Sequence, residues 1–219
     1  MQIKVEGRAM RVAVVGAGGR TGRLVVEQAI ARGDEAIAIV RKPEAHAFSS
    51  PGVHVRRADV RDAEALERAL AGADVVVSTL GVARSRPPTD VYSSGSGNTL
   101  RAMAANGIGT LAVISAAPAG PRDEQPFLQR RVAMPILERF FGGAYDDMRR
   151  METVLSGSES AWVALRPPRL VSRAPTGAYR IDQRPLRKAR VLSFADLATA
   201  LLDVIADASR FHRAWYVAN

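Results

Sequence analysis

The chain contains no cysteine, which excludes disulfides, thiol nucleophiles and thiolate metal sites. It also has no apolar stretch approaching the ~18 residues that a membrane-spanning helix needs, so we expect no membrane partner. The segment Met1–Met10 is mixed in polarity and lacks the apolar core of a secretory signal peptide. Because Met10 directly precedes the first strand signal, we interpret residues 1–9 as a leader or early-start extension. The absence of cysteine fits a cytoplasmic protein, which we expect.

Lysine is scarce, since only three of the 31 basic residues are lysines and the other 28 are arginines. The net charge of +9 and the pI of 10.9 raise the question of a nucleic-acid partner. The arginines are dispersed, however, with no long basic run and no interleaved aromatic residues. We therefore expect no nucleic-acid partner and attribute the charge to attraction of an anionic cofactor or substrate.

Short apolar, β-branched runs alternate with longer segments of helical period. The predicted strands are 12–15, 36–40, 53–56, 75–78, 110–115, 161–165 and 215–217, and the predicted helices are 21–31, 63–71, 91–106, 127–141, 146–156 and 194–206. Such alternation indicates right-handed βαβ crossovers and a parallel sheet covered on both faces. The predicted fold class is α/β, a Rossmann-type doubly wound parallel sheet in a single domain over residues 10–219.

The second half of the chain is less regular than the first. Residues 140–144, with two adjacent glycines, indicate a helix break that leaves Tyr145 ahead of the following helix. Residues 170–190 are rich in proline, glycine and arginine, and we expect loops and short strands over the ligand crevice. Gly33 is placed to end the first helix and Ser193 to cap the last one.

The strongest motif is a glycine-rich loop, residues 16–22, which follows the first strand and opens the first helix. In a dinucleotide site, Gly16 allows the tight turn out of the strand, and Gly18 or Gly19 lets the backbone approach a pyrophosphate. Gly22 lets the helix pack closely on the sheet. A glycine turn without a ligand is the alternative, but the position of the loop in a βαβ unit favours dinucleotide binding.

The helix that begins in this loop adds to the predicted phosphate site. Its N-terminus presents free N–H groups and a partial positive charge. Arg20 and Thr21 add side-chain donors, and we expect Arg20 to point towards the end of the second strand. We therefore predict that both residues contact the cofactor.

The second strand ends in Arg41 and Lys42, where NAD sites usually place an aspartate or glutamate for the ribose 2′-hydroxyl. A guanidinium at this position can bind a 2′-phosphate bidentately and stack on adenine. A solvated basic pair is the alternative in a chain so rich in arginine. We predict NADP(H) rather than NAD(H).

Two further strand ends fit the same cofactor. Asp59 can accept a hydrogen bond from the adenine amine and Val60 can cover the ring, although Asp59 could instead cap the helix that begins near Asp62. The fourth strand ends in Thr79, Leu80 and Gly81, where the chain should pass the ribose and pyrophosphate. The glycine there indicates a close backbone approach.

These residues, together with Ser78 and with 114–116, resemble the motifs of atypical short-chain dehydrogenases/reductases with an NAD(P)H-binding domain. The later stretches 146–152, 165–168 and 176–179 are similar to the biliverdin reductase B/flavin reductase branch and, more distantly, to NmrA-like regulators. The resemblance covers residues 11–218. It implies a doubly wound sheet, and enzymes that reduce flavins, quinones or tetrapyrroles with NADPH.

Carried over by motif, the resemblance implies that Ser115 lies near the nicotinamide and that Arg41 binds the 2′-phosphate. The chain departs from the biliverdin reductase pattern at Met148 and Arg169, where histidines are expected. These departures weaken the case for a tetrapyrrole substrate.

The catalytic candidates are Ser115, Tyr145 and Arg149. Ordinary short-chain dehydrogenases use Tyr-x-x-x-Lys, and this chain has Tyr145 and Arg149 at that spacing, which can in principle protonate a carbonyl oxygen. Packing or substrate contact is the alternative for the tyrosine. Ser115 can bond the nicotinamide carboxamide or the substrate, with a strand-end bond to backbone as the alternative.

Two loops that follow strands carry basic residues, namely Arg84 and Arg86 in 82–90 and Arg122 in 116–125. At the carboxyl ends of parallel strands they would suit an anionic acceptor such as a flavin phosphate, or be solvated charges. The three histidines, His46, His54 and His212, lie on separate segments without metal-ligand spacing. We expect surface or packing roles for them, and no metal site.

Together these patterns predict an NADPH-dependent reductase that transfers hydride to a planar acceptor: a flavin, a quinone or a related conjugated carbonyl. Such transfer depends on close approach of the rings and requires no strong acid. The alternative is a non-catalytic NADP(H)-binding redox sensor of the NmrA-like kind, so the enzyme question stays open. A nucleotide-sugar or isoflavone-type reductase or epimerase is a third reading, which the arginine at 149 weakens. The expected partner is a small-molecule acceptor, in a monomer or small homo-oligomer.

Overall fold

Eight strands form one central sheet in the computed structural model, which describes residues 9–82, 88–124, 130–131 and 134–219. The strands are β1 (Arg11–Val15), β2 (Glu35–Val40), β3 (Val53–Arg57), β4 (Val75–Ser78), β5 (Thr110–Ile114), β6 (Ala161–Arg166), β8 (Arg180–Asp182) and β10 (Arg213–Ala218). Their order is β3-β2-β1-β4-β5-β6-β10-β8, and only β8 pairs antiparallel, with β10. This confirms the predicted doubly wound sheet in a single α/β domain.

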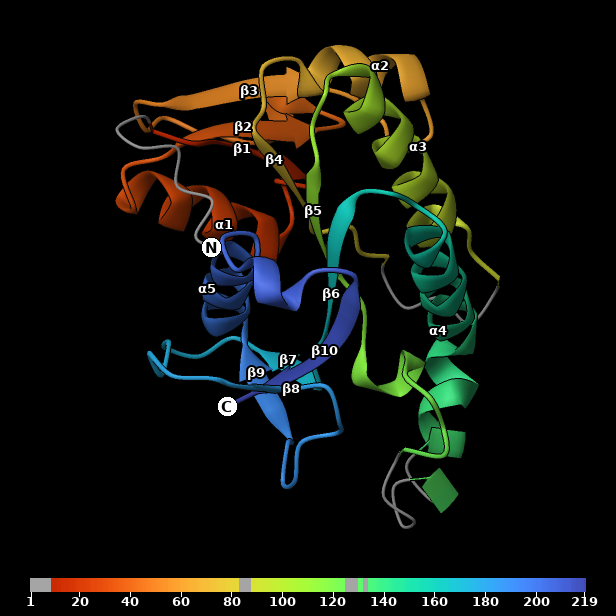
Figure 1. Ribbon diagram of the computed structural model, residues 1–219. Helices are drawn as coiled ribbons and strands as arrows, with labels where there is room; N and C mark the ends of the chain where they lie inside the picture. The colour runs from red at the N-terminus through yellow and green to blue at the C-terminus, as the bar shows by residue number, and fades with distance from the viewer. Residues whose placement is uncertain (1–8, 83–87, 125–129, 132–133) are drawn as a thin grey trace.

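Within the described residues, five helices cover the two faces of the sheet (Figure 1). Helices α1 (Arg20–Ala31) and α5 (Phe194–Val204) pack together on one face. Helices α2 (Ala63–Leu70), α3 (Val91–Ala105) and α4 (Met134–Ser156) line up on the other. The order of strands reverses between β1 and β4, and open α/β sheets bind their ligands outside the carboxyl ends of the strands at such a point.

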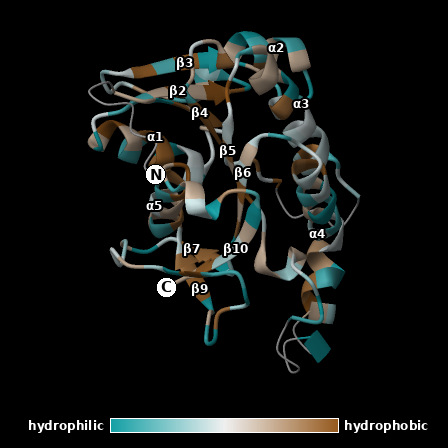
Figure 2. Cartoon of the chain, viewed as in Figure 1, coloured by the Kyte–Doolittle hydropathy of each residue, from teal (hydrophilic) through white to brown (hydrophobic). Residues whose placement is uncertain are grey.

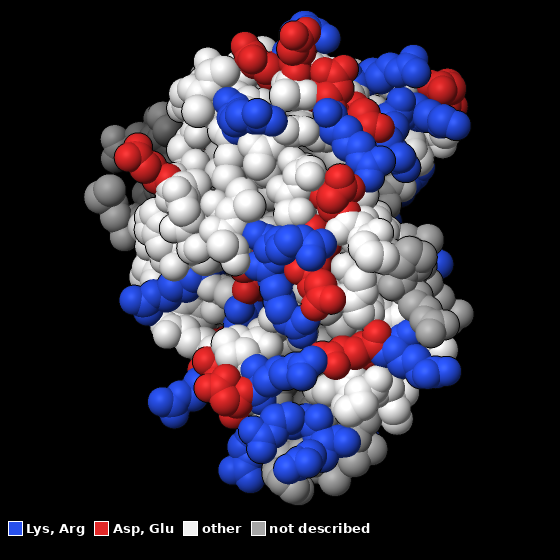
Figure 3. Space-filling view, turned by 90° about the vertical axis from the view of Figure 1, so that its right-hand side faces the viewer, with Lys and Arg blue, Asp and Glu red and all other residues white. Residues whose placement is uncertain are grey.

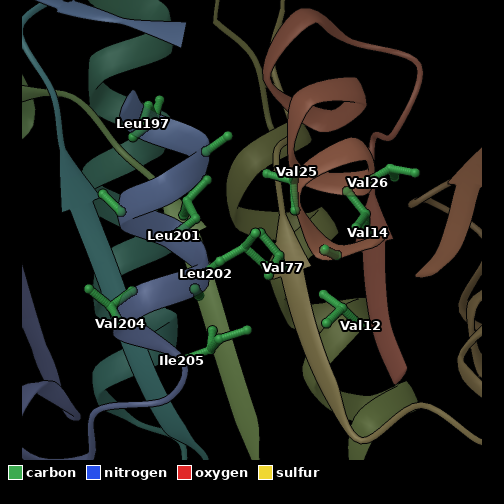
Figure 4. Close-up of a cluster of buried hydrophobic side chains, with 14 of the residues drawn as sticks. Val12, Val14, Val25, Val26, Val77, Leu197, Leu201, Leu202, Val204 and Ile205 are labelled. Carbon is green, nitrogen blue, oxygen red and sulfur yellow. The ribbon is translucent and has the colours of Figure 1, made fainter. Parts of the chain in front are cut away.

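The apolar runs form strands because both faces of the sheet are buried. Along β1, Val12 and Val14 join the cluster under α1 and α5, whereas Ala13 and Val15 join the cluster under the other three helices. The first cluster is shown in Figure 4, and in Figure 2 brown residues gather on the central strands. When both faces of a strand are buried, its sequence is a continuous apolar run and does not alternate between apolar and polar residues.

The ends of α1 and α5 lie where the predicted capping residues place them. Gly33 adopts φ +83° just after α1, a conformation that a β-carbon would strain, and Ser193 accepts a hydrogen bond from the Asp196 N–H as the cap of α5. Short 3₁₀ turns lie at η1 (Pro43–Ala45), η2 (Ala117–Ala119) and η4 (Ala208–Arg210). Two short strands, β7 (Arg169–Val171) and β9 (Val191–Ser193), form a separate parallel pair. Within 170–190, β8 pairs with β10 at the edge of the main sheet, while Ser172 lies 3.4 Å from Arg20 at the start of α1.

The predicted helix break at 140–144 is wrong, because α4 runs without interruption from Met134 to Ser156. Ala144, Met148, Met151 and Leu155 recur on one side of the helix and are all buried in the second cluster. Their burial outweighs the ~1 kcal/mol that each glycine costs in a helix interior. Tyr145 therefore lies within the helix and not ahead of it. The start of the predicted 127–141 helix falls partly outside the described residues.

A fully buried carboxylate joins α4 to α3. Asp147 accepts hydrogen bonds from the Tyr92 N–H at 2.8 Å and from the Ser93 hydroxyl at 2.5 Å. Asp90, the residue before α3, provides no side-chain cap. Asp147 therefore serves as the cap of α3 from a neighbouring helix, and it fixes the position of α4 beside the strand ends.

Candidate functional site: a dinucleotide crevice at the strand ends

The glycine loop has the shape of a phosphate cradle. Gly16 turns out of β1 with φ +80°, and a β-carbon added to it would lie 3.2 Å from the Thr79 carbonyl oxygen. Thr79 also donates its hydroxyl to the carbonyls of Val15 and Gly16, at 3.0 and 3.1 Å. A β-carbon on Gly22 would lie 2.5 Å from the Gly16 carbonyl oxygen. Only glycines at these two positions allow the loop, β4 and α1 to meet so closely.

The first turn of α1 is open to an anion. Gly19 occupies the N-cap position without a side-chain hydrogen bond, and the first turn contains no acidic residue. Thr21 is buried at the start of the helix. Uncapped N–H groups and the positive end of the helix dipole are the features that bind phosphate groups. The loop thus fits the pyrophosphate of a dinucleotide on its geometry alone.

The end of β2 presents two exposed cations. Arg41 and Lys42 follow Val40 directly, and neither forms an ion pair with a described residue. No carboxylate lies at the strand end, where NAD sites usually place one. The structure therefore leaves both side chains available to an anionic ligand.

Arg20 does not point towards β2, contrary to our expectation. Its guanidinium lies 3.4 Å from the Ser172 hydroxyl and 5.6 Å from the ring centroid of Phe194, on the side of α5 and β7. Arg23, one turn further along α1, faces the β2 side instead and contacts His46 at 3.0 Å. Although both arginines lie in the first turns of α1, their long side chains reach opposite sides, and the motif did not specify which arginine faces which end.

The ends of β3 and β4 border the same crevice. Asp59 is exposed and accepts from the Arg61 N–H at 3.0 Å, whereas the cap of α2 is Asp62, so the helix-cap alternative for Asp59 is wrong. Val60 and Leu80 both pack against Gly95 of α3. No described atom lies within 4 Å of a β-carbon placed on Gly81, so contacts within the described chain do not require a glycine there.

Ser115 is held by Glu152, which belongs to the family-like stretch 146–152 but was not among the predicted site residues. Its hydroxyl is buried and donates to Oε1 of Glu152 at 2.7 Å, while its N–H donates to the Leu165 carbonyl. Arg166, at the end of β6, donates two hydrogen bonds to the same carboxylate, from Nε at 3.0 Å and from Nη2 at 2.5 Å. The side chains of Glu152 and Arg166 are only 13% and 11% exposed. This chain of contacts links the ends of β5 and β6 to α4.

Charge and burial shift the pKa values of two residues in and beside this network. Burial alone would lower the pKa of Arg166, but the hydrogen bonds and the charge of Glu152 outweigh burial and raise it. The Arg166 guanidinium also lies 5.3 Å from the ring centroid of Tyr216, whose pKa burial raises to about 12. Arg166 is therefore a fixed cation and Tyr216 a neutral phenol at physiological pH.

Tyr145 and Arg149 do not form a pair with Ser115. Tyr145 packs into the cluster beneath α3 and α4, with its ring centroid 6.1 Å from that of Phe141, and burial raises the pKa of its phenol. Arg149 donates to Asp146 at 2.6 Å and to the Pro118 carbonyl at 3.0 Å. In the described part of the chain no hydrogen bond or ion pair joins either side chain to Ser115 or Glu152. The structure thus gives no hydrogen-bond link between the Tyr-x-x-x-Arg residues and Ser115, and a catalytic role for Tyr145 and Arg149 stays a prediction.

A groove of about 920 Å³ lies beside α4, over β6 and β10. The ionised side chains that line it are Arg122, Glu124, Arg149, Glu152, Arg166 and Arg213. Arginines outnumber glutamates on this lining, so the groove has a net positive charge. Figure 3 shows basic and acidic side chains interspersed over this side of the molecule, with a group of basic ones at its lower end.

The three histidines and the loop arginines that the sequence analysis named lie in different places. His46 lies against the glycine loop, His54 is exposed 3.8 Å from Glu35, and His212 lines the groove. Arg84 and Arg86 lie outside the described residues. Among the residues that are described, no group of three or more histidines, aspartates and glutamates could hold a metal ion, and no helix is long and apolar enough to cross a membrane.

The comparisons with known proteins begin with a family model described as NAD(P)H-binding, which matches residues 16–208. Among curated proteins, an uncharacterised protein of Mycobacterium tuberculosis is 36% identical over 117 residues, which is 53% of this chain. An uncharacterised protein of Mycobacterium bovis matches equally well. The aligned segment spans only 13% of the length of these relatives.

Solved structures share the fold over nearly the whole chain. An anaerobilin reductase of Escherichia coli O157:H7 is 23% identical, with a TM-score of 0.78 over 95% of this chain and 97% of that one. A proposed NADH-flavin reductase of Streptococcus pneumoniae is 19% identical, with a TM-score of 0.78 over 96% and 100%. A short-chain dehydrogenase/reductase of Veillonella parvula is 15% identical, with a TM-score of 0.80 over 97% and 95%. At such identities the likeness shows the fold alone.

Proposed function

The chain belongs to the NAD(P)H-binding family, and from that premise we propose that it is an NADPH-dependent reductase that transfers hydride to a planar acceptor. The acceptor classes are flavins, quinones and related conjugated carbonyls. The cofactor, when bound, supplies the hydride from its nicotinamide ring. The protein supplies the phosphate cradle, the orientation of the ring and the charge around the acceptor.

The observation that carries the NADPH preference is the end of β2. Arg41 and Lys42 are exposed and make no ion pair with described residues, and no carboxylate follows Val40. A carboxylate at this position would accept from a ribose 2′-hydroxyl and repel a 2′-phosphate. A guanidinium there favours the phosphate, through charge and bidentate geometry.

Ser115 supports a positioning role beside the nicotinamide. A serine hydroxyl has one hydrogen and two acceptor lone pairs, and the hydrogen of Ser115 is committed to Glu152 at 2.7 Å. Ser115 is therefore left as an acceptor, which suits the amide group of the carboxamide and not the delivery of a proton to substrate. Arg166 holds the Glu152 side chain in place from the opposite side and so keeps the serine in that orientation.

The groove beside α4 supports an anionic acceptor. Its excess of arginine attracts negative charge, and Arg213 makes no ion pair with a described carboxylate. The anaerobilin reductase and the proposed NADH-flavin reductase that share this fold carry names that refer to extended conjugated substrates. A phosphorylated flavin combines a conjugated ring with a negative charge, so we place FMN first among the candidates.

The test is NADPH oxidation followed by absorbance, with FMN, riboflavin, menadione and biliverdin as acceptors. We expect acceptor-dependent turnover with NADPH that falls sharply with NADH. Arg41→Ala should raise the KM for NADPH about 10- to 100-fold and leave that for NADH unchanged, because it removes a charge-assisted contact to the 2′-phosphate. The matched control is Arg68→Ala, which removes the same charge from an exposed site on α2. Equal losses for both cofactors would contradict the role of Arg41.

A second candidate is a non-catalytic NADP(H)-binding redox sensor. One observation favours it: in the described structure no hydrogen bond joins the hydroxyls of Ser115 and Tyr145, and the hydrogen of Ser115 goes to Glu152. Binding of NADPH in a titration without turnover of any of the four acceptors would support the sensor over the reductase.

A further inference from the structure

The ring of His46 occupies the space that a side chain at position 18 would fill. A β-carbon built on Gly18 would overlap the imidazole, with Nε2 as the nearest ring atom and Cε1 and Cδ2 at 2.6 and 2.9 Å. His46 arrives from the segment that follows β2 and the short helix η1, far from the glycine loop in sequence. Gly18 thus admits an imidazole onto the wall of the phosphate loop.

The contacts of His46 fix which nitrogen carries its hydrogen. Nδ1 lies 3.0 Å from Nη2 of Arg23, and a guanidinium can only donate, so Nδ1 accepts and the neutral ring carries its hydrogen on Nε2. Arg23 is itself held by Phe48, with its guanidinium carbon 5.4 Å from the ring centroid. The ring of Phe48 also flanks His46, at 6.4 Å between centroids. Arg23 and Phe48 therefore orient the imidazole.

This orientation leaves one polar group unpaired. Nε2–H has no acceptor among the described residues, although it is the ring atom closest to Gly18. The uncapped N-terminus of α1 presents further donors in the same loop, and its first turn contains no acidic residue. Donors gathered around one loop without an acceptor favour an anion with several oxygens.

We propose that His46 binds the cofactor pyrophosphate through Nε2–H, with Arg23 as the positioning residue that sets its tautomer. The inference rests on the proposed function in requiring a dinucleotide in this loop, but not on which acceptor is reduced. It assigns the pyrophosphate a donor from outside the glycine motif. Arg41, on the same segment, serves the ribose phosphate.

The first test is the affinity of the protein for NADPH, NADH and ADP, measured by calorimetric titration. His46→Ala should weaken all three about tenfold, because all three carry a pyrophosphate and lose one hydrogen bond to an ionised group. His46→Gln keeps an N–H donor at a similar reach and should stay within about threefold of wild type. His54→Ala removes an exposed histidine from β3 and should leave binding unchanged.

A double-mutant cycle with Gly18 tests the contact itself. The β-carbon in Gly18→Ala would displace the ring, so adding His46→Ala to it should cause little further loss. Independent, additive losses would overturn the contact. A second readout is ¹⁵N NMR of the imidazoles, feasible because the chain has only three histidines. We expect the hydrogen of His46 on Nε2 in the free protein and a shift of that signal when ADP binds.

Three further outcomes would overturn the inference. Tighter binding by His46→Ala would mean that the ring obstructs the site. A loss confined to NADPH would move the contact to the 2′-phosphate, and no change at all would remove His46 from the site. If wild type binds none of the three nucleotides, it is the proposed function that fails. If wild type binds and oxidises NADPH while His46→Ala behaves identically, only this inference fails.

Discussion

A methyl group at Gly22 tests how closely α1 docks on the phosphate loop. Alanine normally stabilises a helix interior by ~1 kcal/mol relative to glycine. At Gly22 the new carbon would lie 2.5 Å from the Gly16 carbonyl oxygen and 2.7 Å from the Ala17 α-carbon, both rigid backbone atoms. These distances are about an ångström shorter than ordinary contact, and overpacking of this kind costs ~1–3 kcal/mol or more. We therefore expect a net loss of about 1–2 kcal/mol in the free energy of unfolding.

The assay is urea unfolding of Gly22→Ala with and without NADPH. Because relief of the overlap must move the loop, the variant should also bind NADPH at least tenfold more weakly. The matched control is Gly97→Ala in α3, where the added carbon would meet only the Val154 side chain, at 4.0 Å. That variant should gain up to ~1 kcal/mol. A Gly22→Ala protein as stable as wild type, with unchanged affinity, would refute the close docking and with it the cradle.

Three other predictions concern the scaffold around the site. Asp147→Ala strands the Tyr92 N–H and the Ser93 hydroxyl, and should cost ~2–4 kcal/mol in urea unfolding, with Asp147→Asn losing less. Gly142→Ala should raise stability by ~0.5–1 kcal/mol in thermal unfolding, because nothing lies within 4 Å of the added carbon, whereas a helix break there would give a loss. Burial acts to raise the pKa of Asp196, but hydrogen bonds from Ser193 and its neighbours outweigh burial and lower it. Its contribution to stability is therefore present above its unfolded pKa of about 4 and is lost as pH falls through the lower folded value, so Asp196→Asn should flatten the acid limb of a stability-versus-pH curve.

The sheet could be predicted from sequence because its signal is local. Runs such as Val12–Val15 and Val75–Ser78 are apolar throughout, since both faces of the sheet are covered, and no other environment suits so short a run between glycines and helices. The failure came at α4, where two adjacent glycines outweighed the apolar spacing on each side of them. Intrinsic propensity favours a break there, and the tertiary packing of Met148 and Met151 overrides it.

The cofactor-binding loop could also be predicted from the sequence, because its signal is local too. Its loop needs glycines at fixed positions, and glycine is the residue whose placement carries steric information without any partner being known. The directions of the arginine side chains around the loop could not be predicted from the sequence. The motif contains Arg20, yet the arginine that faces the β2 side is Arg23, and the histidine it orients comes from 23 residues further along the chain. A contact of that separation leaves no local pattern.

The Ser115 network shows where reading from sequence stops. Glu152 and Arg166 are 14 residues apart and each looks like an ordinary charge, one on a helix of mixed polarity and one at a strand end. Both side chains are largely buried once α4 packs on the sheet. A carboxylate that is removed from water needs a cation and hydrogen-bond donors around it, and the folded chain supplies both. The hydroxyl of Ser115 is one such donor. The same burial commits the hydrogen of the serine to Glu152 and leaves its oxygen as an acceptor, so a helix–sheet contact sets the hydrogen bonds that Ser115 can offer a ligand.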